Sequence, residues 1–192
     1  MPATIADRRA RACSNLLRAV HVITDREGVT PSALHAIKLV LIALAQKTEL
    51  FPPGDFAMPD AQARNHPLLV EHNDGHGLSL TIGLPGKEAA PHDHGIWCVN
   101  AVISGRERHH FYRRTDAGTG PTELTKVGEV TVEPGTGMAM SDHDIHSTEV
   151  LGDQPAIGLA LYGYALTRFP AVVWHHLALG TSRASPSRRI MA

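Results

Sequence analysis

Residues 86–105 read GKEAAPHDHGIWCVNAVISG, and this stretch decides the fold. It is bounded by Gly86 and Gly105, and each glycine is suited to a tight turn because it tolerates left-handed backbone. Between them, His92 and His94 stand two residues apart. Side chains at positions i and i+2 of a strand share a face, so this spacing predicts two imidazoles directed at one metal ion.

A second histidine-bearing segment, GEVTVEPGTGMAMSDHDIHSTEV, begins at residue 128 and contains a Pro-Gly turn. We expect it to supply a third ligand, His146, from a facing strand. His143 is the competing residue, but extended backbone places positions 143 and 146 on opposite faces, so only one of them can ligate. Three neutral imidazoles suit Fe(II), Zn(II), Cu(II) or Ni(II) and leave coordination positions open for small molecules.

The sequence around these segments has the alternation of short apolar runs and turns that is typical of an all-β domain. From Phe51 onward, short runs rich in Val, Ile, Leu and Thr alternate with turn clusters such as HNDGHG, LPGKEA and TDAGTG. We expect strands at about 67–72, 78–84, 92–103, 107–113, 122–126, 129–132, 137–141, 145–150 and 156–164. The segment PAVVWHH is a further strand or a short helix. Strands at this spacing predict a closed or sandwich-like barrel.

The start of the chain differs, because apolar residues recur there at helical spacing. One helix is expected from about Ile5 to Ile23. A second is expected from Pro31, after a Thr cap, to about Ala45, since proline fits the first position of a helix. We therefore predict one domain with three parts: a helical pair at 1–50 packed on the barrel, a barrel at 51–178, and a flexible tail at 179–192.

Composition limits the class of protein. The 192 residues include 18 basic and 19 acidic side chains, with no basic run of the kind that binds nucleic acid. No apolar stretch approaches the roughly 20 residues that span a bilayer, and the start lacks a secretory signal, so we expect a cytoplasmic protein with two free cysteines and no membrane partner. Histidine is abundant, with 13 residues. Apart from the candidate ligands, we expect histidines to be surface or packing residues, including His21, His35, His109, His110, His175 and His176.

The stretch 86–105 fits the first motif of the cupin superfamily, G-x5-H-x-H-x3-4-E-x6-G, with Cys98 in place of the glutamate. With that cysteine, the chain resembles the cysteine dioxygenase family of thiol dioxygenases, from about Asp60 to Phe169. The resemblance implies a mainly β fold, the cupin double-stranded β-helix barrel of jelly-roll type, preceded by two N-terminal α-helices.

The resemblance also implies a chemistry. In that family, three histidines hold Fe(II), and a cysteine at the position of Cys98 cross-links to a tyrosine that positions substrate and dioxygen. Here Tyr162 fits the tyrosine, with Tyr164 in reserve. The implied reaction oxidises a small thiol carboxylate, cysteine or a mercapto acid, to its sulfinic acid with O2. The site could also carry Zn, Ni or another divalent metal.

The chain departs from the family in two places. The Ser-His-Tyr set of the family reads Gly158, Ala160 and Tyr162 here. The residue that binds the substrate carboxylate is also changed. The candidates for that role are Arg64, His66 and Arg168.

These departures keep two other functions open. The first is a cupin dioxygenase or isomerase that acts on a non-thiol substrate at the same three histidines. The second is a non-catalytic cupin that binds a small ligand.

Overall fold

The computed structural model describes residues 2–60, 63–71, 75–115, 123–163, 173–176 and 181–184, the last two segments by their backbone alone. Its helices are α1 (Ile5–Glu27) and α2 (Pro31–Ala45), followed by the 3-10 turns η1 (Thr48–Leu50) and η2 (Pro53–Asp55). Its strands are β1 (Ala63–Val70), β2 (Gly77–Gly83), β3 (Glu88–Asp93), β4 (Cys98–Ser104), β5 (Glu107–Arg114), β6 (Leu124–Val132), β7 (Gly137–Met140), β8 (Ile145–Val150), β9 (Ala156–Tyr162), β10 (Val173–His176) and β11 (Thr181–Ala184).

Both helices begin at a threonine that caps the free backbone N–H groups. The Thr4 hydroxyl accepts from the Asp7 amide at 3.1 Å, and the Asp7 carboxylate accepts from the Thr4 amide at 3.0 Å. The Thr30 hydroxyl accepts from the Ala33 amide at 3.1 Å, and Pro31 occupies the first turn, as predicted. No helix in the described part of the chain is long and apolar enough to cross a bilayer.

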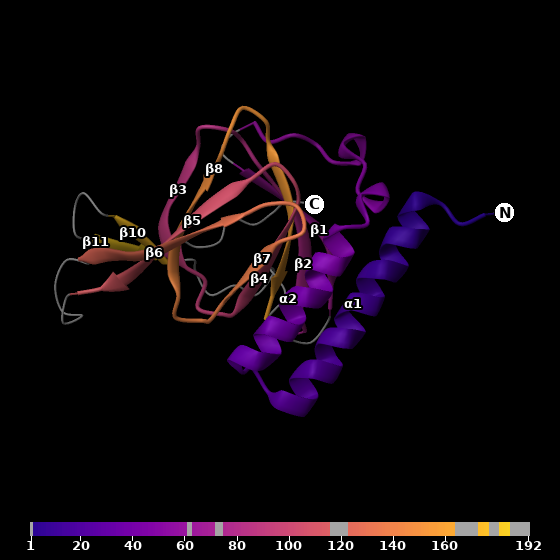
Figure 1. Ribbon diagram of the computed structural model, residues 1–192, viewed down its shortest axis with the longest axis horizontal. Coiled ribbons are helices and arrows are strands. Elements are labelled where there is room, and N and C mark those ends of the chain that lie inside the picture. The colour runs from indigo at the N-terminus through magenta and orange to yellow at the C-terminus, as the bar shows by residue number, and fades with distance from the viewer. Residues whose placement is uncertain are drawn as a thin grey trace.

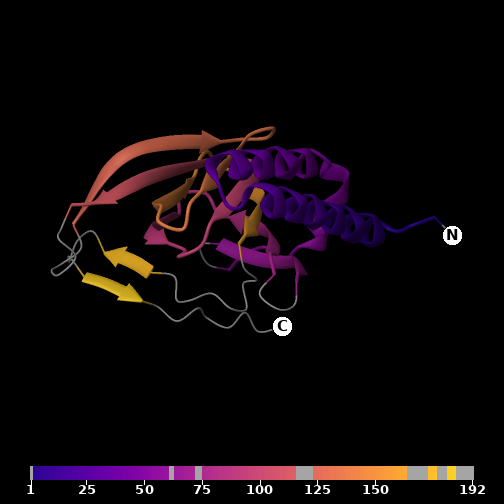
Figure 2. The ribbon, with the colours of Figure 1, turned by 90° about the horizontal axis from the view of Figure 1, so that it is seen from below.

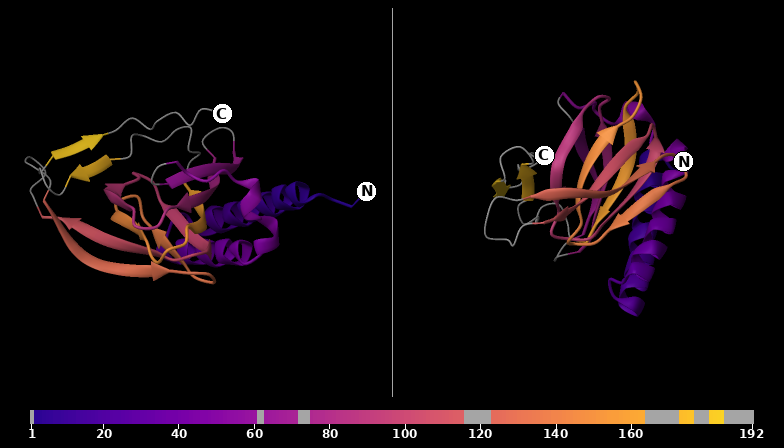
Figure 3. Two further views of the ribbon diagram at one scale, coloured as in Figure 1. Left: turned by 90° about the horizontal axis from the view of Figure 1, so that it is seen from above. Right: turned by 60° about the vertical axis from the view of Figure 1, so that its left-hand side comes forward.

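The strands form two antiparallel sheets, with the orders β1-β2-β9-β4-β7 and β11-β10-β3-β8-β5-β6 (Figure 1). Strands that are neighbours in a sheet are mostly distant in sequence, as in β2-β9 and β3-β8, and this is the connectivity of a jelly roll. The expected fold class, a mainly β jelly-roll barrel preceded by two helices, is therefore confirmed. The hairpin β5-β6 extends beyond the barrel on the side away from the helices (Figures 2 and 3).

The helices cover the outer face of the five-stranded sheet. Apolar side chains of α1 and α2 pack there against every second residue of β2, β4 and β9. The fully buried members of this layer include Leu17, Val20, Ile37, Leu41, Leu78, Leu80, Leu159 and Leu161. This apolar layer anchors the sheet and leaves its other face for the space between the sheets.

A second, smaller core lies between the two sheets, on what we call the interior face. Its buried members are Ile96, Cys98, Val102, Val132, Met138, Met140, Ala160 and Tyr162. Strand alternation explains the division, because Val99 and Ala101 face the helices while Cys98 and Val102 face the interior. Trp97 packs with the helical layer, as expected for a core residue.

Three local expectations differ from the structure. The strand expected at 92–103 is two strands, β3 and β4, which belong to different sheets. The segments expected at 122–126 and 129–132 merge into the single strand β6, which pairs with β5 on both sides of a register shift between Phe111 and Tyr112. In the expected flexible tail, residues 181–184 form β11, whose backbone pairs with β10; residues 185–192 lie outside the described residues.

Candidate metal centre

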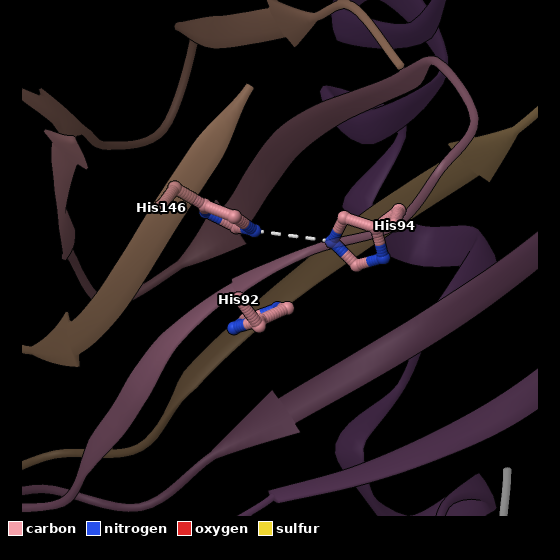
Figure 4. A group of neighbouring side chains, drawn as sticks. All are labelled: His92, His94 and His146. Carbon is pink, nitrogen blue, oxygen red and sulfur yellow. Dashed lines mark hydrogen bonds between the residues drawn. The ribbon is translucent and has the colours of Figure 1, made fainter. Parts of the chain in front are cut away.

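Three imidazoles converge at one end of the interior face. His92 in β3 and His146 in β8 are direct partners across the two strands, with ring centroids 4.5 Å apart. His94 meets them from the turn after β3, and its Nε2 lies 3.1 Å from Nε2 of His146 (Figure 4). One ring nitrogen of each residue lies within 4.8 Å of those of the other two. His92 and His146 are buried, so the group is sheltered and compatible with a metal ion.

The way in which His94 reaches this group differs from the expected one. Strand β3 ends at Asp93, so His94 does not share a strand with His92. The chain turns immediately afterwards, with a φ of 62° at Gly95. The register of β3 against β8 also shifts between Ala89 and His92. The bend after Asp93 brings His94 to His92, and the register shift before His92 precedes its pairing with His146.

The structure groups His146, and not His143, with the other two imidazoles. The side chain of His143 is 90% exposed, whereas His146 is 3% exposed. His143 lies in the turn before β8, where the Asp144 carboxylate accepts from the Ser141 amide at 2.6 Å. That bond holds the turn and leaves His143 pointing into solvent.

Hydrogen bonds to Nδ1 orient two of the three rings. Nδ1 of His92 lies 2.9 Å from the carbonyl oxygen of Ala90. A carbonyl only accepts, so Nδ1 of His92 carries the hydrogen and Nε2 has the lone pair. Nδ1 of His146 lies 3.3 Å from Nδ1 of His109. This contact leaves Nε2 of His146 for the centre of the group.

His109 belongs to a buried polar chain behind His146. Its Nε2 lies 3.3 Å from a carboxylate oxygen of Glu107, and its Nδ1 lies 3.0 Å from the hydroxyl of Thr148. His109 is 1% exposed and Glu107 is 9% exposed. With Nδ1–H of His146 donating to His109 and Nε2–H of His109 donating to Glu107, the chain Glu107–His109–His146 fixes the tautomer of His146.

His109 is buried, which is one of the two placements expected for it, but its contact with His146 was not predicted. His109 and Glu107 alternate on β5, and the register pairs His109 with Thr148 and Phe111 with His146. The i, i+2 spacing of a carboxylate and an imidazole was the available signal. Its partner could not be read from the sequence, because the pairing of β5 with β8 joins distant segments.

Burial favours the uncharged form of His94 and of His146. Removal from water, followed by the charge of nearby His92, lowers the pKa of His94 to about 3. The same causes hold the pKa of His146 well below its ordinary value. Neutral imidazole is the form that ligates a metal, so these side chains are ready to bind at neutral pH.

Cys98 and Tyr162 lie next to this group. They are direct partners across β4 and β9, and their side chains hydrogen-bond to each other. The one hydrogen of the Cys98 thiol is donated to the amide oxygen of Asn100 at 3.2 Å, so the Tyr162 hydroxyl is the donor to Sγ of Cys98. Burial raises the pKa of the thiol and, together with the neighbouring Cys98, that of the Tyr162 phenol, so both keep their protons. The ring of Tyr162 lies 5.5 Å from that of His94, whereas Tyr164 lies outside the described residues.

One buried hydroxyl stands out on the interior face. Ser79 is fully buried, and its Oγ has no hydrogen-bond partner among the described residues. Its neighbours Leu78 and Leu80 face the helices, so Ser79 faces the interior, paired with Ala160. Asn100 pairs with Ala160 from the other side. Ala160 thus lies between Ser79 and Asn100, in the cross-strand row next to the one that holds Tyr162 and Cys98.

Arg64 and His66 are not brought to the imidazoles. They pair with Ile82 and Leu80, so they lie on the helical side of the sheet. An Arg64 nitrogen lies 3.4 Å from the carbonyl oxygen of Met58, and Nε2 of His66 lies 2.9 Å from that of Ala57. Arg64 and His66 share a face, as strand alternation requires, but that face is turned away from the barrel interior.

The third candidate, Arg168, lies outside the described residues. On the interior face of the described strands β2, β4, β8 and β9, the paired positions contain no lysine or arginine. Within those strands, no cation is available for a substrate carboxylate.

No protein-family model matches the chain, and no curated protein matches it. Similar solved structures include an oxalate oxidase in complex with glycolate, with a TM-score of 0.42 and 14% identity over 55% of this chain and 53% of that one. A Cupin_2 domain of an XRE family transcriptional regulator from Enterobacter cloacae matches with a TM-score of 0.40 and 20% identity, over 54% of this chain and 98% of that one. The chain spans about half the length of the oxalate oxidase (53%), and these likenesses concern the fold alone.

Proposed function

We propose that His92, His94 and His146 hold a divalent metal, and that this metal is Fe(II). The donor set fits, because three neutral nitrogens converge and two rings are oriented by hydrogen bonds to Nδ1. Three neutral ligands leave the charge of the metal uncompensated, which favours an anionic substrate such as a thiolate.

The proposed reaction is the oxidation of a small thiol to its sulfinic acid. A thiolate and one O2 combine to give the sulfinate, with both oxygen atoms transferred to sulfur and none left over. Bound Fe(II) would supply the electron transfer that ground-state O2 requires for this insertion. The single observation that carries the proposal is the Cys98–Tyr162 pair beside the three imidazoles, because a metal site alone would serve many reactions.

The side chains around the site would orient the substrate and the metal ligand, and would exclude water. Cys98 holds the protonated Tyr162 hydroxyl in place by accepting its hydrogen, and a bound substrate or oxygen would draw that hydrogen away from Sγ. The Glu107–His109 pair keeps His146 directed at the metal. Ile96, Met140 and Val102 line the interior and exclude water from the reacting atoms.

The substrate class we propose is a small thiol carboxylate, cysteine or a mercapto acid. Ser79, Thr81 and Asn100 are polar residues on the interior face of β2 and β4 that could meet its far end. A cationic partner for the carboxylate remains the predicted role of Arg168.

The test is oxygen uptake by the iron-loaded protein with cysteine, cysteamine, mercaptopropionate and mercaptosuccinate. We expect uptake with at least one thiol carboxylate and a product 32 mass units heavier than the substrate, a value set by the two added oxygen atoms. His143→Ala should retain uptake, whereas His92→Ala should lose it with the iron. Absence of uptake with all four thiols, in protein that holds one iron per chain, would exclude the thiol reaction.

Two observations favour a second function. The paired interior positions of β2, β4, β8 and β9 carry no cation, and Gly158 and Ala160 stand where the thiol dioxygenases carry Ser and His. Both features suit a metal-dependent dioxygenase or isomerase that acts on a non-thiol substrate, or a barrel that binds a small ligand without turnover. Turnover of a diketone or flavonol without any thiol would support this alternative.

A further inference from the structure

A second group of metal-binding side chains lies outside the barrel, between α1 and the β1-β2 hairpin. It consists of His21 of α1, Glu71 just after β1, and His76 just before β2. One donor atom of each lies within 4.8 Å of the other two. None of the three belongs to the site described above.

Glu71 is already directed at His21. Its carboxylate oxygens lie 2.9 and 3.0 Å from Nε2 of His21. The backbone N–H of Glu71 donates to the carbonyl of His76 at 3.1 Å, and the N–H of His76 donates to the Glu71 carboxylate at 2.9 Å. These reciprocal bonds hold the carboxylate in the hairpin before any ligand arrives.

A hydrogen bond from Nδ1 orients the ring of His76. Its Nδ1 lies 3.1 Å from the carbonyl oxygen of Gly163, so Nδ1 carries the hydrogen and Nε2 has the lone pair. The ring also packs against Trp97, with centroids 5.3 Å apart, and lies 4.9 Å from the ring of His21. An Nδ1–H bonded to a carbonyl is the usual support of a histidine that ligates a metal through Nε2.

The spacing suits a small transition-metal ion. Around a tetrahedral Zn²⁺ with bonds of about 2.0–2.1 Å, donor atoms are about 3.3 Å apart, which lies inside the range found here. The side chains of His21 and Glu71 are 45% and 25% exposed, so an ion has access. Asp25 stands one helical turn after His21, and its negative charge acts on His76.

We propose that His21, Glu71 and His76 form a second site for a divalent transition metal of the Zn²⁺ class, which joins α1 to the barrel. Two imidazoles and one carboxylate bind the ion, and water or Asp25 completes the coordination. The site has a structural role, because its ligands come from the helical layer and the edge of the sheet, so the ion links two parts of the fold. The inference does not depend on the proposed reaction.

The experiment isolates this site by removing the other. In a variant with His92→Ala, His94→Ala and His146→Ala, Zn²⁺ binding is measured by competition with a chromophoric chelator. We expect one Zn²⁺ per chain, with affinity at least 10-fold weaker after His21→Ala or His76→Ala. His35→Ala is the matched control, because His35 is an exposed histidine on α2, and its affinity should be unchanged.

A second measurement uses the unaltered barrel. Zn²⁺ saturation of the full chain should give two equivalents, and one equivalent after His21→Gln, with an unchanged circular dichroism spectrum. Binding of no Zn²⁺ by the folded triple variant would mean that His21 and Glu71 form an ion pair only, and would overturn the proposal. The proposal would also be overturned if the triple variant still bound one Zn²⁺ per chain after His21→Ala and after His76→Ala.

Discussion

The barrel group (His92, His94 and His146) and the helical group (His21, Glu71 and His76) place histidines in contrasting environments. The barrel group joins three imidazoles without a carboxylate among its members, and its member His146 is 3% exposed. The helical group joins two imidazoles to Glu71, and its member His21 has a side chain 45% exposed. A neutral, buried set leaves the positive charge of a metal available to an incoming anion. A set with its own carboxylate offsets that charge and suits a structural ion.

The largest effect expected in the barrel follows loss of a ligand. His146→Ala should reduce iron retention by more than about 100-fold, because a lost ligand exceeds the about 10- to 100-fold cost of changes behind a ligand. Iron per chain after dialysis is the measurement, and His143→Ala is the control. If His146→Ala retained a full equivalent of iron, the barrel group would not be the metal centre. The contrast between the barrel group and the helical group would then not hold.

The polar chain behind His146 has the next largest expected effect. Glu107→Gln and His109→Asn should each weaken metal binding by about 10- to 100-fold, since both release the tautomer and orientation of His146. Metal affinity by chelator competition is the measurement.

His110→Ala supplies the control for that experiment. His110 follows His109 but pairs with Ser147 on the outer face of the sheet, where it lies near Glu88 and Glu129. Equal losses of metal affinity in His110→Ala and His109→Asn would show that the effect belongs to strand β5 as a whole.

Tyr162→Phe separates binding of the metal from turnover. The hydroxyl lies beside the imidazoles but is not among the ligands, so we expect full iron retention and a fall in kcat of about 10-fold or more. Tyr112→Phe is the matched control, because its hydroxyl contacts Ser147 at 3.2 Å on the outer face. An unchanged kcat in Tyr162→Phe would remove the observation on which the thiol reaction rests.

The smallest effect is expected at Ser79. Ser79→Ala should raise KM by about 2- to 10-fold, since it deletes one neutral hydrogen bond to substrate, and should not lower stability, since this hydroxyl is unpaired among the described residues. Ser147→Ala is the contrast. Its buried hydroxyl donates to Glu88 at 3.1 Å, so its loss should cost about 1 kcal/mol of stability and leave KM unchanged. Steady-state kinetics and urea unfolding measure both.

The barrel and its three imidazoles could be predicted because their signals are local. Turn residues at regular spacing predict an all-β fold, and the H-x-H pair with a later histidine predicts the group. What could not be predicted depends on which distant strands pair. Glu107 and His109 gain a role only when β5 lies beside β8, and His21 meets Glu71 only when α1 packs on the hairpin. Arg64 and His66 show the same limit, because alternation indicates a shared face but not which face is buried.

The contact between His76 and the carbonyl of Gly163 has a consequence for directed evolution of the protein. Gly163 follows Tyr162 in the chain and donates its N–H to Trp97, which precedes Cys98. The peptide segments that carry the Tyr162 and Cys98 side chains are therefore braced by a residue on the far side of the sheet. Libraries that vary the substrate of the proposed reaction should include the helical layer, where a change can tilt the phenol without altering the lining of the barrel.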